Sequence, residues 1–351
     1  MSNKSKPIIA VTLGDAGGIG SELIAKLLSR ADVRESAHIV LVADRWQWEQ
    51  GQEVAQMSVE MFEVDSFIGL RELTQANRHH GLPMFLDVST LDAAKAKFAD
   101  ANKSCGRSVL DVLNLCMDAC VSKQADAICF APLNKEAMKL GGLKHEDELH
   151  HFAEYLGVDP GTHYFCEFNT LGHLWTSRIS SHVPLKDIIQ YLDSDRIKAA
   201  AKLIYTSLQA NGIEQPRVAV AALNPHGGDG GTCGREEIEI ITPAIDELNK
   251  EGFPIVGPFP ADTIFLKARD REFDAIVTMY HDQGQIAIKL MGFERGVTVQ
   301  GGLPVPITTP AHGTAYDIAG QNKANVEATY QAFKIAARMG NWYLNDKSLF
   351  S

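Results

Sequence analysis

The sequence predicts an α/β protein with two lobes and mainly parallel sheets, in an α/β/α arrangement. Short apolar runs, typical of strands buried in parallel sheets, alternate with stretches whose apolar residues recur at helical spacing. Most strand-like runs end at a cluster of polar and glycine residues. The chain has 351 residues, 45% of them hydrophobic, which is enough for a substantial core and favours two lobes over one.

The expected elements follow one another without a long linker or a repeat. Buried strands are predicted at residues 8–13, 39–43, 127–131, 217–223 and 274–279, and residues 178–185 are interpreted as a strand that runs into a proline turn. Helical spacing predicts helices at 21–29 and 109–121. A further helix is expected to begin with Ser194 as its cap, to bury Ile197, Ala201, Ile204 and Leu208, and to end at Asn211 and Gly212.

The composition limits the possible partners. The formal net charge is -11 and no block of Lys and Arg stands out, which argues against nucleic acid and against an anionic membrane surface. No run approaches the roughly 18 apolar residues of a membrane span, and the apolar stretch before Gly14 is too short for a signal peptide. The cysteines form no CxxC pair, and Cys116 and Cys120 share one helical face. We therefore expect a soluble, cytoplasmic protein with buried, reduced thiols.

A glycine loop follows the first predicted strand. Gly14-Asp15-Ala16-Gly17-Gly18-Ile19-Gly20 leads into a helix and then into a second strand that ends at Asp44. This order is similar to a dinucleotide-binding opening, but G-x-x-G-G-x-G is not the G-x-G-x-x-G spacing. The Rossmann interpretation is therefore not favoured, and Asp15 is the more distinctive feature of the loop.

Three histidines occupy equivalent positions in the predicted topology. His182, His226 and His281 each stand just after a predicted strand, and parallel strands bring their carboxyl ends together. Three imidazoles leave open positions on a divalent metal, as in catalytic sites. The alternative is that these histidines simply pack. Residues 144–151 are also rich in possible ligands, but we interpret them as a solvated helix start, with His145 as the exception.

Nine motifs, in order over nearly the whole chain, resemble those of the 4-hydroxythreonine-4-phosphate dehydrogenase family of vitamin B6 biosynthesis and its catabolic relatives. They are GDAGGIGSE (14–22), APLNKEA (131–137), SSHVPL (180–185), LNPHGGDGG (223–231), REE (235–237), PADT (260–263), MYHDQG (279–284), GFERGV (292–297) and HGTAYDIAG (312–320). The resemblance implies that His182, His226 and His281 bind zinc, magnesium, cobalt or manganese. It also implies a homodimer whose metal site is shared between the subunits.

The family is similar in fold to isopropylmalate and isocitrate dehydrogenases, and this implies a cofactor site. The residues expected there are Gly14, Asp15, Gly18, Gly20, His312, Gly313, Thr314, Ala315, Asp317 and Asn325. Asp317 would accept hydrogen bonds from a ribose 2′-hydroxyl and repel a 2′-phosphate, so NAD is expected over NADP. We assign residues 1–132 and 300–351 to a cofactor-binding lobe, and residues 133–299 to a lobe for metal, substrate and dimerisation.

The implied reaction is the oxidation of a secondary alcohol in a small hydroxy acid. A metal acting as a Lewis acid lowers the pKa of the alcohol, so that hydride can leave for NAD, and decarboxylation can follow when the alcohol lies β to a carboxylate. Lys289 matches a substrate-binding lysine of the family, and Asn134 and Lys135 stand where a proton relay is plausible. Asp282 would either bind the metal or orient His281.

Three substrate positions depart from the family pattern. His145 matches a substrate-binding histidine, but Glu146 replaces a threonine, Thr298 an asparagine and Ile307 an arginine. A carboxylate ~4 Å from a phosphate, at an effective dielectric near 20, costs about 4 kcal/mol for each pair of unit charges. We therefore predict a substrate other than 4-phosphohydroxythreonine. The alternatives are the family's own reaction, a metal-dependent lyase or epimerase, and a non-catalytic ligand-binding relative.

Overall fold

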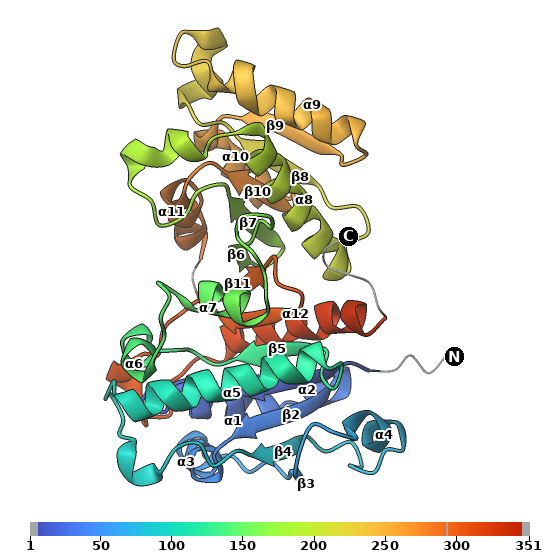
Figure 1. The fold of residues 1–351 in the computed structure, drawn as a ribbon, viewed down its shortest axis with the longest axis vertical. Coiled ribbons are helices and arrows are strands. Elements are labelled where there is room, and N and C mark those ends of the chain that lie inside the picture. The colour runs from blue at the N-terminus through green and yellow to red at the C-terminus, as the bar shows by residue number, and fades with distance from the viewer. Residues whose placement is uncertain (1–5, 293, 346–351) are drawn as a thin grey trace. The chain divides into compact units, whose positions relative to one another are not determined.

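The computed structural model describes residues 6–292 and 294–345, and the chain divides into two compact units (Figure 1). Unit 1 consists of the chain up to Val158 and from Leu303 onward, and unit 2 is Asp159–Gly302. One lobe is thus built from both ends of the chain, but the predicted boundaries differ, since residues 133–158 belong to unit 1. Residues 1–5, at which the absence of a signal peptide was expected, and Phe293 of the GFERGV motif lie outside the described residues.

Unit 1 contains a sheet of six parallel strands in the order β3-β4-β2-β1-β5-β12. The strands are β1 (Ile8–Thr12), β2 (His38–Ala43), β3 (Phe62–Val64), β4 (Met84–Asp87), β5 (Ala127–Phe130) and β12 (Ile307–Pro310). In the central register Ile9 lies opposite Ile39 and Ala127. Every residue of β1 and β5 is buried, which explains why these strands read as continuous apolar runs.

The helices of unit 1 surround its sheet. They are α1 (Gly20–Leu28), α2 (Ala31–Ser36), α3 (Arg45–Ala55), α4 (Leu70–Gln75), α5 (Lys103–Val121), α6 (Lys135–Gly141), α7 (Glu148–Tyr155) and α12 (Glu327–Leu344), with short 3-10 turns η1 (Ala93–Lys95) and η5 (Tyr316–Ile318). A Cβ on Gly106 of α5 would lie 1.7 Å from the carbonyl oxygen of Ala137 in α6. The rings of Phe130 and Phe152 meet edge to face at 6.0 Å. These contacts explain why residues 133–158 belong to unit 1.

Unit 2 contains a mixed sheet in the order β11-β6-β7-β10-β8-β9, in which β6 runs antiparallel to β7 and β11 and the other pairs are parallel. The strands are β6 (Cys166–Leu171), β7 (Leu174–Arg178), β8 (Val218–Ala221), β9 (Ile255–Phe259), β10 (Ala275–Thr278) and β11 (Gly296–Gly301). The helical segments are η2 (Leu185–Tyr191), α8 (Ser194–Ala210), η3 (Pro225–Gly231), η4 (Glu237–Ile241, a π-helix), α9 (Thr242–Lys250), α10 (Ala261–Arg269) and α11 (His281–Met291).

The predicted α/β class with mainly parallel strands is confirmed, and two local predictions are wrong. Residues 178–185 are not a strand, because β7 ends at Arg178 and His182 has a left-handed φ of 53°. The cap of α8 is Asp193, whose side chain accepts a hydrogen bond from the N–H of Arg196 at 2.8 Å, and not Ser194.

The expected helix start at residues 144–151 agrees with the structure, whereas the expectation of buried thiols is wrong at Cys233. Asp147 caps α7, as the interpretation of residues 144–151 as a helix start requires. All six cysteines are free and five are buried, whereas Cys233 is exposed. Within residues 6–292 and 294–345, every helix is too short or too polar to serve as a membrane span.

Candidate functional site

The glycine loop after β1 is fastened to the end of β5. The N–H of Asp15 donates to the carbonyl oxygen of Pro132 at 3.0 Å. Gly14 has a left-handed φ of 65°, and a Cβ there would lie 2.5 Å from the carbonyl oxygens of Ala131 and Pro132. Only glycine fits so close an approach of two backbones, so the loop stays at the carboxyl edge of the sheet.

The two segments predicted to hold the cofactor lie against each other in unit 1. The N–H of Ile19 donates to the carbonyl oxygen of Thr314 at 3.1 Å, and a Cβ on Gly18 would lie 2.8 Å from the Cβ of Thr314. Farther along, the buried carboxylate of Glu22 accepts from the N–H of Ala324 at 2.7 Å. Residues 14–22 and 312–325 therefore form one continuous surface.

The other predicted cofactor residues belong to this same surface. A Cβ on Gly20 would lie 2.0 Å from the carbonyl oxygen of Leu13, which keeps α1 close to β1. The ring of His312 is 3.0 Å from the carbonyl oxygen of exposed Gly313, and the Asn325 side chain accepts from the N–H of Glu327. Asp317 is exposed, so its carboxylate is accessible to a ligand.

Asp15 lies in the interior of this surface, with a side chain only 1% exposed. Its Oδ2 accepts a hydrogen bond from the hydroxyl of Tyr316 at 2.7 Å, whereas Oδ1 has no partner among the described residues. Burial raises the pKa of Asp15, against the lowering effect of the Tyr316 hydrogen bond. Burial and the neighbouring carboxyl also raise the pKa of Tyr316. Sequence reasoning missed Tyr316, because no spacing rule connects it with a residue so distant in the chain.

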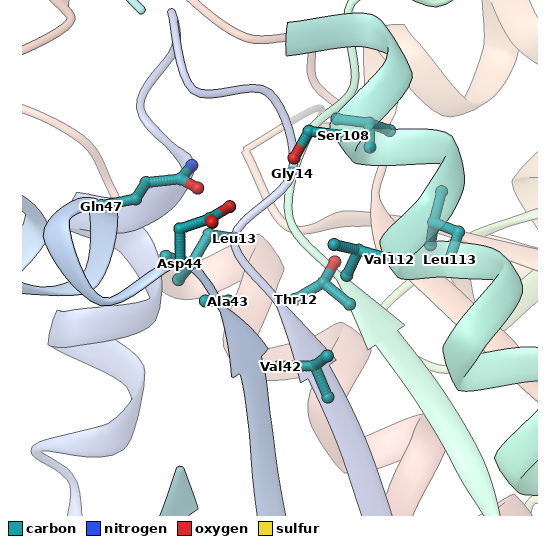
Figure 2. A pocket seen from close by; sticks show the side chains of 11 residues that line it. Thr12, Leu13, Gly14, Val42, Ala43, Asp44, Gln47, Ser108, Val112 and Leu113 are labelled. Atoms are coloured by element: carbon teal, nitrogen blue, oxygen red, sulfur yellow. The ribbon is translucent and has the colours of Figure 1, made fainter. Parts of the chain in front are cut away.

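A small cavity lies beside the same loop, with Asp44 in its lining. The cavity, of about 10 Å³, has room for roughly one water molecule and is surrounded by the side chains in Figure 2. It is lined by Thr12, Leu13, Gly14, Val42, Ala43, Asp44, Gln47, Ser108, Val109, Val112 and Leu113. The buried carboxylate of Asp44 accepts from the N–H of Leu91 at 3.0 Å and from the hydroxyl of Thr90 at 2.9 Å. Asp44 thus holds the loop that contains Thr90 and Leu91.

Two of the three predicted metal ligands lie together in unit 2. The ring centroids of His182, past the end of β7, and His281, at the start of α11, are 5.7 Å apart. Both line a pocket of about 270 Å³ together with Ser180, Val183, Leu185, Ile188, Tyr280 and Asp282. Asp282 Oδ1 lies 2.7 Å from His281 Nδ1, an arrangement that orients the ring and presents Nε2 to a ligand.

His226 does not join the other two histidines in a compact ligand set. Its side chain is 71% exposed, and its Nδ1 is 3.3 Å from Asp229 Oδ2. Among the described residues, the one set of three or more His, Cys, Asp or Glu whose ligand atoms lie within 4.8 Å of one another is Glu146, Asp147 and His150. One copy of the chain therefore supplies two neighbouring imidazoles and a third that is exposed on unit 2.

The turn that carries His226 is held by a buried acid that sequence reasoning also missed. Glu237 is 3% exposed, and its Oε1 accepts from the N–H groups of Leu223 and Asn224 at 2.9 and 2.7 Å. Its Oε2 accepts from the Asn224 side chain at 2.9 Å. This anchoring stabilises a turn in which His226 has a left-handed φ of 52°. The REE motif was the available signal, and the π-helix that begins at Glu237 is a feature frequent at functional sites.

The predicted substrate residues of unit 1 cluster around α6 and α7. His145 Nε2 is 2.6 Å from Glu154 Oε2, and Glu146 Oε1 is 3.4 Å from His150 Nε2. The Asn134 side chain caps α6 by accepting from the N–H of Ala137 at 2.9 Å. Exposed Lys135 has its Nζ 3.7 Å from Glu148 Oε2.

The remaining substrate positions differ in accessibility. Lys289 is exposed in the last turn of α11, whereas Thr298 is 8% exposed within β11, where its hydroxyl is 3.4 Å from the Asn169 amide nitrogen. Ile307 is fully buried in β12 and lies opposite Ile128. The residue that replaces the family's arginine therefore belongs to the core.

Comparisons with known proteins agree over nearly the whole chain. The model of the family described as pyridoxal phosphate biosynthetic protein PdxA matches residues 35–336. A Pseudomonas aeruginosa protein named "putative 4-hydroxythreonine-4-phosphate dehydrogenase 2" is 49% identical, covering 97% of this chain and 99% of its own. A "putative D-threonate 4-phosphate dehydrogenase" of Oceanobacillus iheyensis is 34% identical, covering 94% and 98%. The crystal structure of a 4-hydroxythreonine-4-phosphate dehydrogenase from Burkholderia phymatum has a TM-score of 0.79 at 30% identity, covering 95% and 98%. These relatives are all named as dehydrogenases, which supports the expected class of oxidoreductase.

Proposed function

Because the chain belongs to the pyridoxal phosphate biosynthetic protein PdxA family, we propose that it oxidises the secondary alcohol of a small hydroxy acid, with NAD as hydride acceptor and a divalent metal ion at its histidines. The observation that carries the proposal is the His182–His281 pair, in which Nδ1 of His281 is hydrogen bonded to the Asp282 carboxylate. A histidine backed by a carboxylate in this way is the usual arrangement of a metal ligand.

The donor set fits a catalytic metal rather than a structural one. His182 and His281 provide two imidazole nitrogens, and His226 provides a third from a second copy of the chain, so the active form is a homodimer with a shared site. The exposure of His226 supports this, because an exposed imidazole on an anchored turn is available to another subunit. When bound, zinc, magnesium, cobalt or manganese would polarise the substrate alcohol as a Lewis acid.

The cofactor binds at the surface formed by residues 14–22 and 312–325. Its residues are Gly14, Asp15, Gly18, Gly20, His312, Gly313, Thr314, Ala315, Asp317 and Asn325. The exposed carboxylate of Asp317 accepts hydrogen bonds from the ribose hydroxyls and repels a 2′-phosphate, so NAD is preferred to NADP. Close backbone packing at Gly18 and Thr314 supports this assignment.

Residues outside the metal and cofactor sites bind the substrate. The exposed ammonium of Lys289 pairs with the substrate carboxylate, and Asp282 keeps His281 in the required tautomer. Lys135 moves the alcohol proton together with Asn134, whose side chain also caps α6. His145 and Thr298 complete the set. Whether decarboxylation follows depends on a carboxylate β to the alcohol.

Glu146 determines the substrate class in this proposal. Its carboxylate is exposed and is 3.4 Å from a ring nitrogen of His150. A phosphate beside this carboxylate is repelled, whereas an amine or a hydroxyl can donate to it. The substrate is accordingly an unphosphorylated four- to six-carbon hydroxy acid rather than a 4-phosphate of the kind in the relatives' names.

The test is a panel of four- to six-carbon hydroxy acids, with and without a phosphate, assayed for NADH formation by absorbance. We expect unphosphorylated acids to be turned over, and chelation or His281→Ala to lower kcat/KM by about a thousandfold or more, in line with the loss of a catalytic electrostatic stabiliser. Efficient oxidation of 4-phosphohydroxythreonine would contradict the substrate assignment and favour the family's own reaction. Metal-dependent consumption of a substrate without NADH formation would favour a lyase or epimerase.

A further inference from the structure

Tyr316 connects two segments that are 301 positions apart in the sequence. Its hydroxyl donates to Asp15 Oδ2 at 2.7 Å, and it stands at the start of η5, directly after Ala315. Ala315 has a left-handed φ of 44°, a conformation that costs free energy for an L-residue with a Cβ. The strain at Ala315, next to the hydrogen bond that joins the two loops, indicates that the fold fixes the position of the Tyr316 phenol.

The surroundings of Asp15 make this hydroxyl important. The titratable groups that act on the carboxyl are Tyr316, Asp100 and Cys105. Oδ1 is buried and has no partner among the described residues. The acid is therefore buried beside another acid, and Tyr316 contributes the side-chain donor that offsets this cost. A carboxyl kept in such a place has a role beyond packing.

We propose that Tyr316 is a positioning residue for the cofactor, because its bond to Asp15 holds residues 14–20 and 312–320 in the arrangement that binds NAD. This inference rests on the proposed function. A backbone hydrogen bond from the N–H of Ile19 to the carbonyl oxygen of Thr314 joins the same two loops, so the hydroxyl of Tyr316 adds a side-chain bond to a backbone one. Without this hydrogen bond the two loops populate other arrangements. The apparent affinity for NAD then falls in proportion to the fraction of molecules whose loops can still bind it.

The experiment compares Tyr316→Phe with Tyr330→Phe. Tyr330, in α12 of the same unit, also donates its hydroxyl to an aspartate, Asp32, but at an exposed site. Each variant is titrated with NADH, followed by fluorescence, and its Tm is measured. We expect the Kd for NADH to rise about tenfold in Tyr316→Phe, the effect of losing one hydrogen bond that orders the site. Tyr330→Phe is expected to bind NADH as the wild type does.

The Tm separates positioning from general stability, because both variants are titrated well below it, where they are folded. An unchanged Kd in Tyr316→Phe overturns the proposal, as does an equal rise of the Kd in Tyr330→Phe. Failure of the wild type to bind NADH would instead refute the proposed function itself.

Discussion

Buried carboxylates in this protein differ in how completely they are hydrogen bonded. Glu237 accepts from two backbone N–H groups and one amide, and Asp44 accepts from Leu91 and Thr90. Asp15 and Glu22, by contrast, each have one buried oxygen without a partner among the described residues. The other oxygen of Glu22 lies 2.7 Å from the ammonium of Lys26, whereas the other oxygen of Asp15 accepts from the neutral phenol of Tyr316. Burial therefore costs more at Asp15, and at the residue scale we associate this cost with the proposed cofactor site.

This cost predicts a pH-dependent gain in stability for Asp15→Asn. The raised folded-state pKa of Asp15 means that its protonated form is favoured in the native state. That contribution is fully present below the unfolded pKa and is lost as the pH rises through the folded pKa. Relative to the wild type, Asp15→Asn should therefore gain about 1–2 kcal/mol at pH 8 and less at pH 4, measured by urea unfolding.

The matched control is Asp32→Asn. Asp32 is an exposed carboxylate whose pKa is lowered by hydrogen bonds from Tyr330 and Arg30. Its contribution is present above the unfolded pKa and is lost as the pH falls, so the trend has the opposite sign. If both variants followed the same trend, burial of Asp15 would not be the cause of its shift.

At the scale of elements, close helix packing determines where unit 1 ends. Gly106 in α5 and Gly141 in α6 face each other, since a Cβ on Gly141 would lie 2.4 Å from the backbone carbon of Gly106. This contact fixes α6 directly after β5, and Asn134 caps the helix at that point. Two predicted site residues, Asn134 and Lys135, are thereby held on a rigid helix start.

Gly106→Ala should disrupt this arrangement. Alanine normally stabilises a helix by about 1 kcal/mol relative to glycine. Here its methyl group would lie 1.7 Å from the carbonyl oxygen of Ala137, so we expect a net loss of about 2–3 kcal/mol in the free energy of unfolding. Arg107→Ala, at the exposed neighbouring position, is the control and should change stability by less than about 0.5 kcal/mol. A more stable Gly106→Ala would show that the helices can move apart.

The sequence predicts elements well where a pattern is local and poorly where a partner is distant. The strands around Val11 and Val277 are continuous apolar runs, and both were predicted. The extension of β7 to residue 185 was wrong, because apolar and polar residues alternate past Arg178 although the backbone turns at His182. Tyr316 and Glu237 were missed as site residues, since their partners become neighbours only in the folded chain.

At the scale of the whole molecule, the three histidines belong to one unit but not to one compact set. His182 and His281 share a pocket, and His226 stands on a separately anchored turn. The exposed apolar side chains of Leu185, Ile286 and Leu290 lie on η2 and α11, the segments next to the paired histidines. An apolar surface beside the proposed metal site agrees with the proposed subunit interface.

Mixing two inactive variants tests whether the site is shared. If His226 comes from the second subunit, a heterodimer of His226→Ala and His281→Ala contains one intact site and one doubly mutated site. Random reassortment should then restore about a quarter of the wild-type specific activity. Each variant alone stays inactive. If all three ligands came from the same chain, the mixture would remain as inactive as its components, although the protein could still be dimeric by sedimentation.

Unit 1 begins at the first strand of the chain but is completed by β12 and α12, which come after the whole of unit 2. On the ribosome, β5 emerges before β12, the strand that covers its open edge. The loop around Asp15 likewise emerges before Tyr316, which is its hydrogen-bond donor. All of unit 2 is synthesised before β12 and α12, so the bond between Asp15 and Tyr316 can form only near the end of translation. A nascent chain stalled near residue 300 would therefore present an unfinished parallel sheet to chaperones.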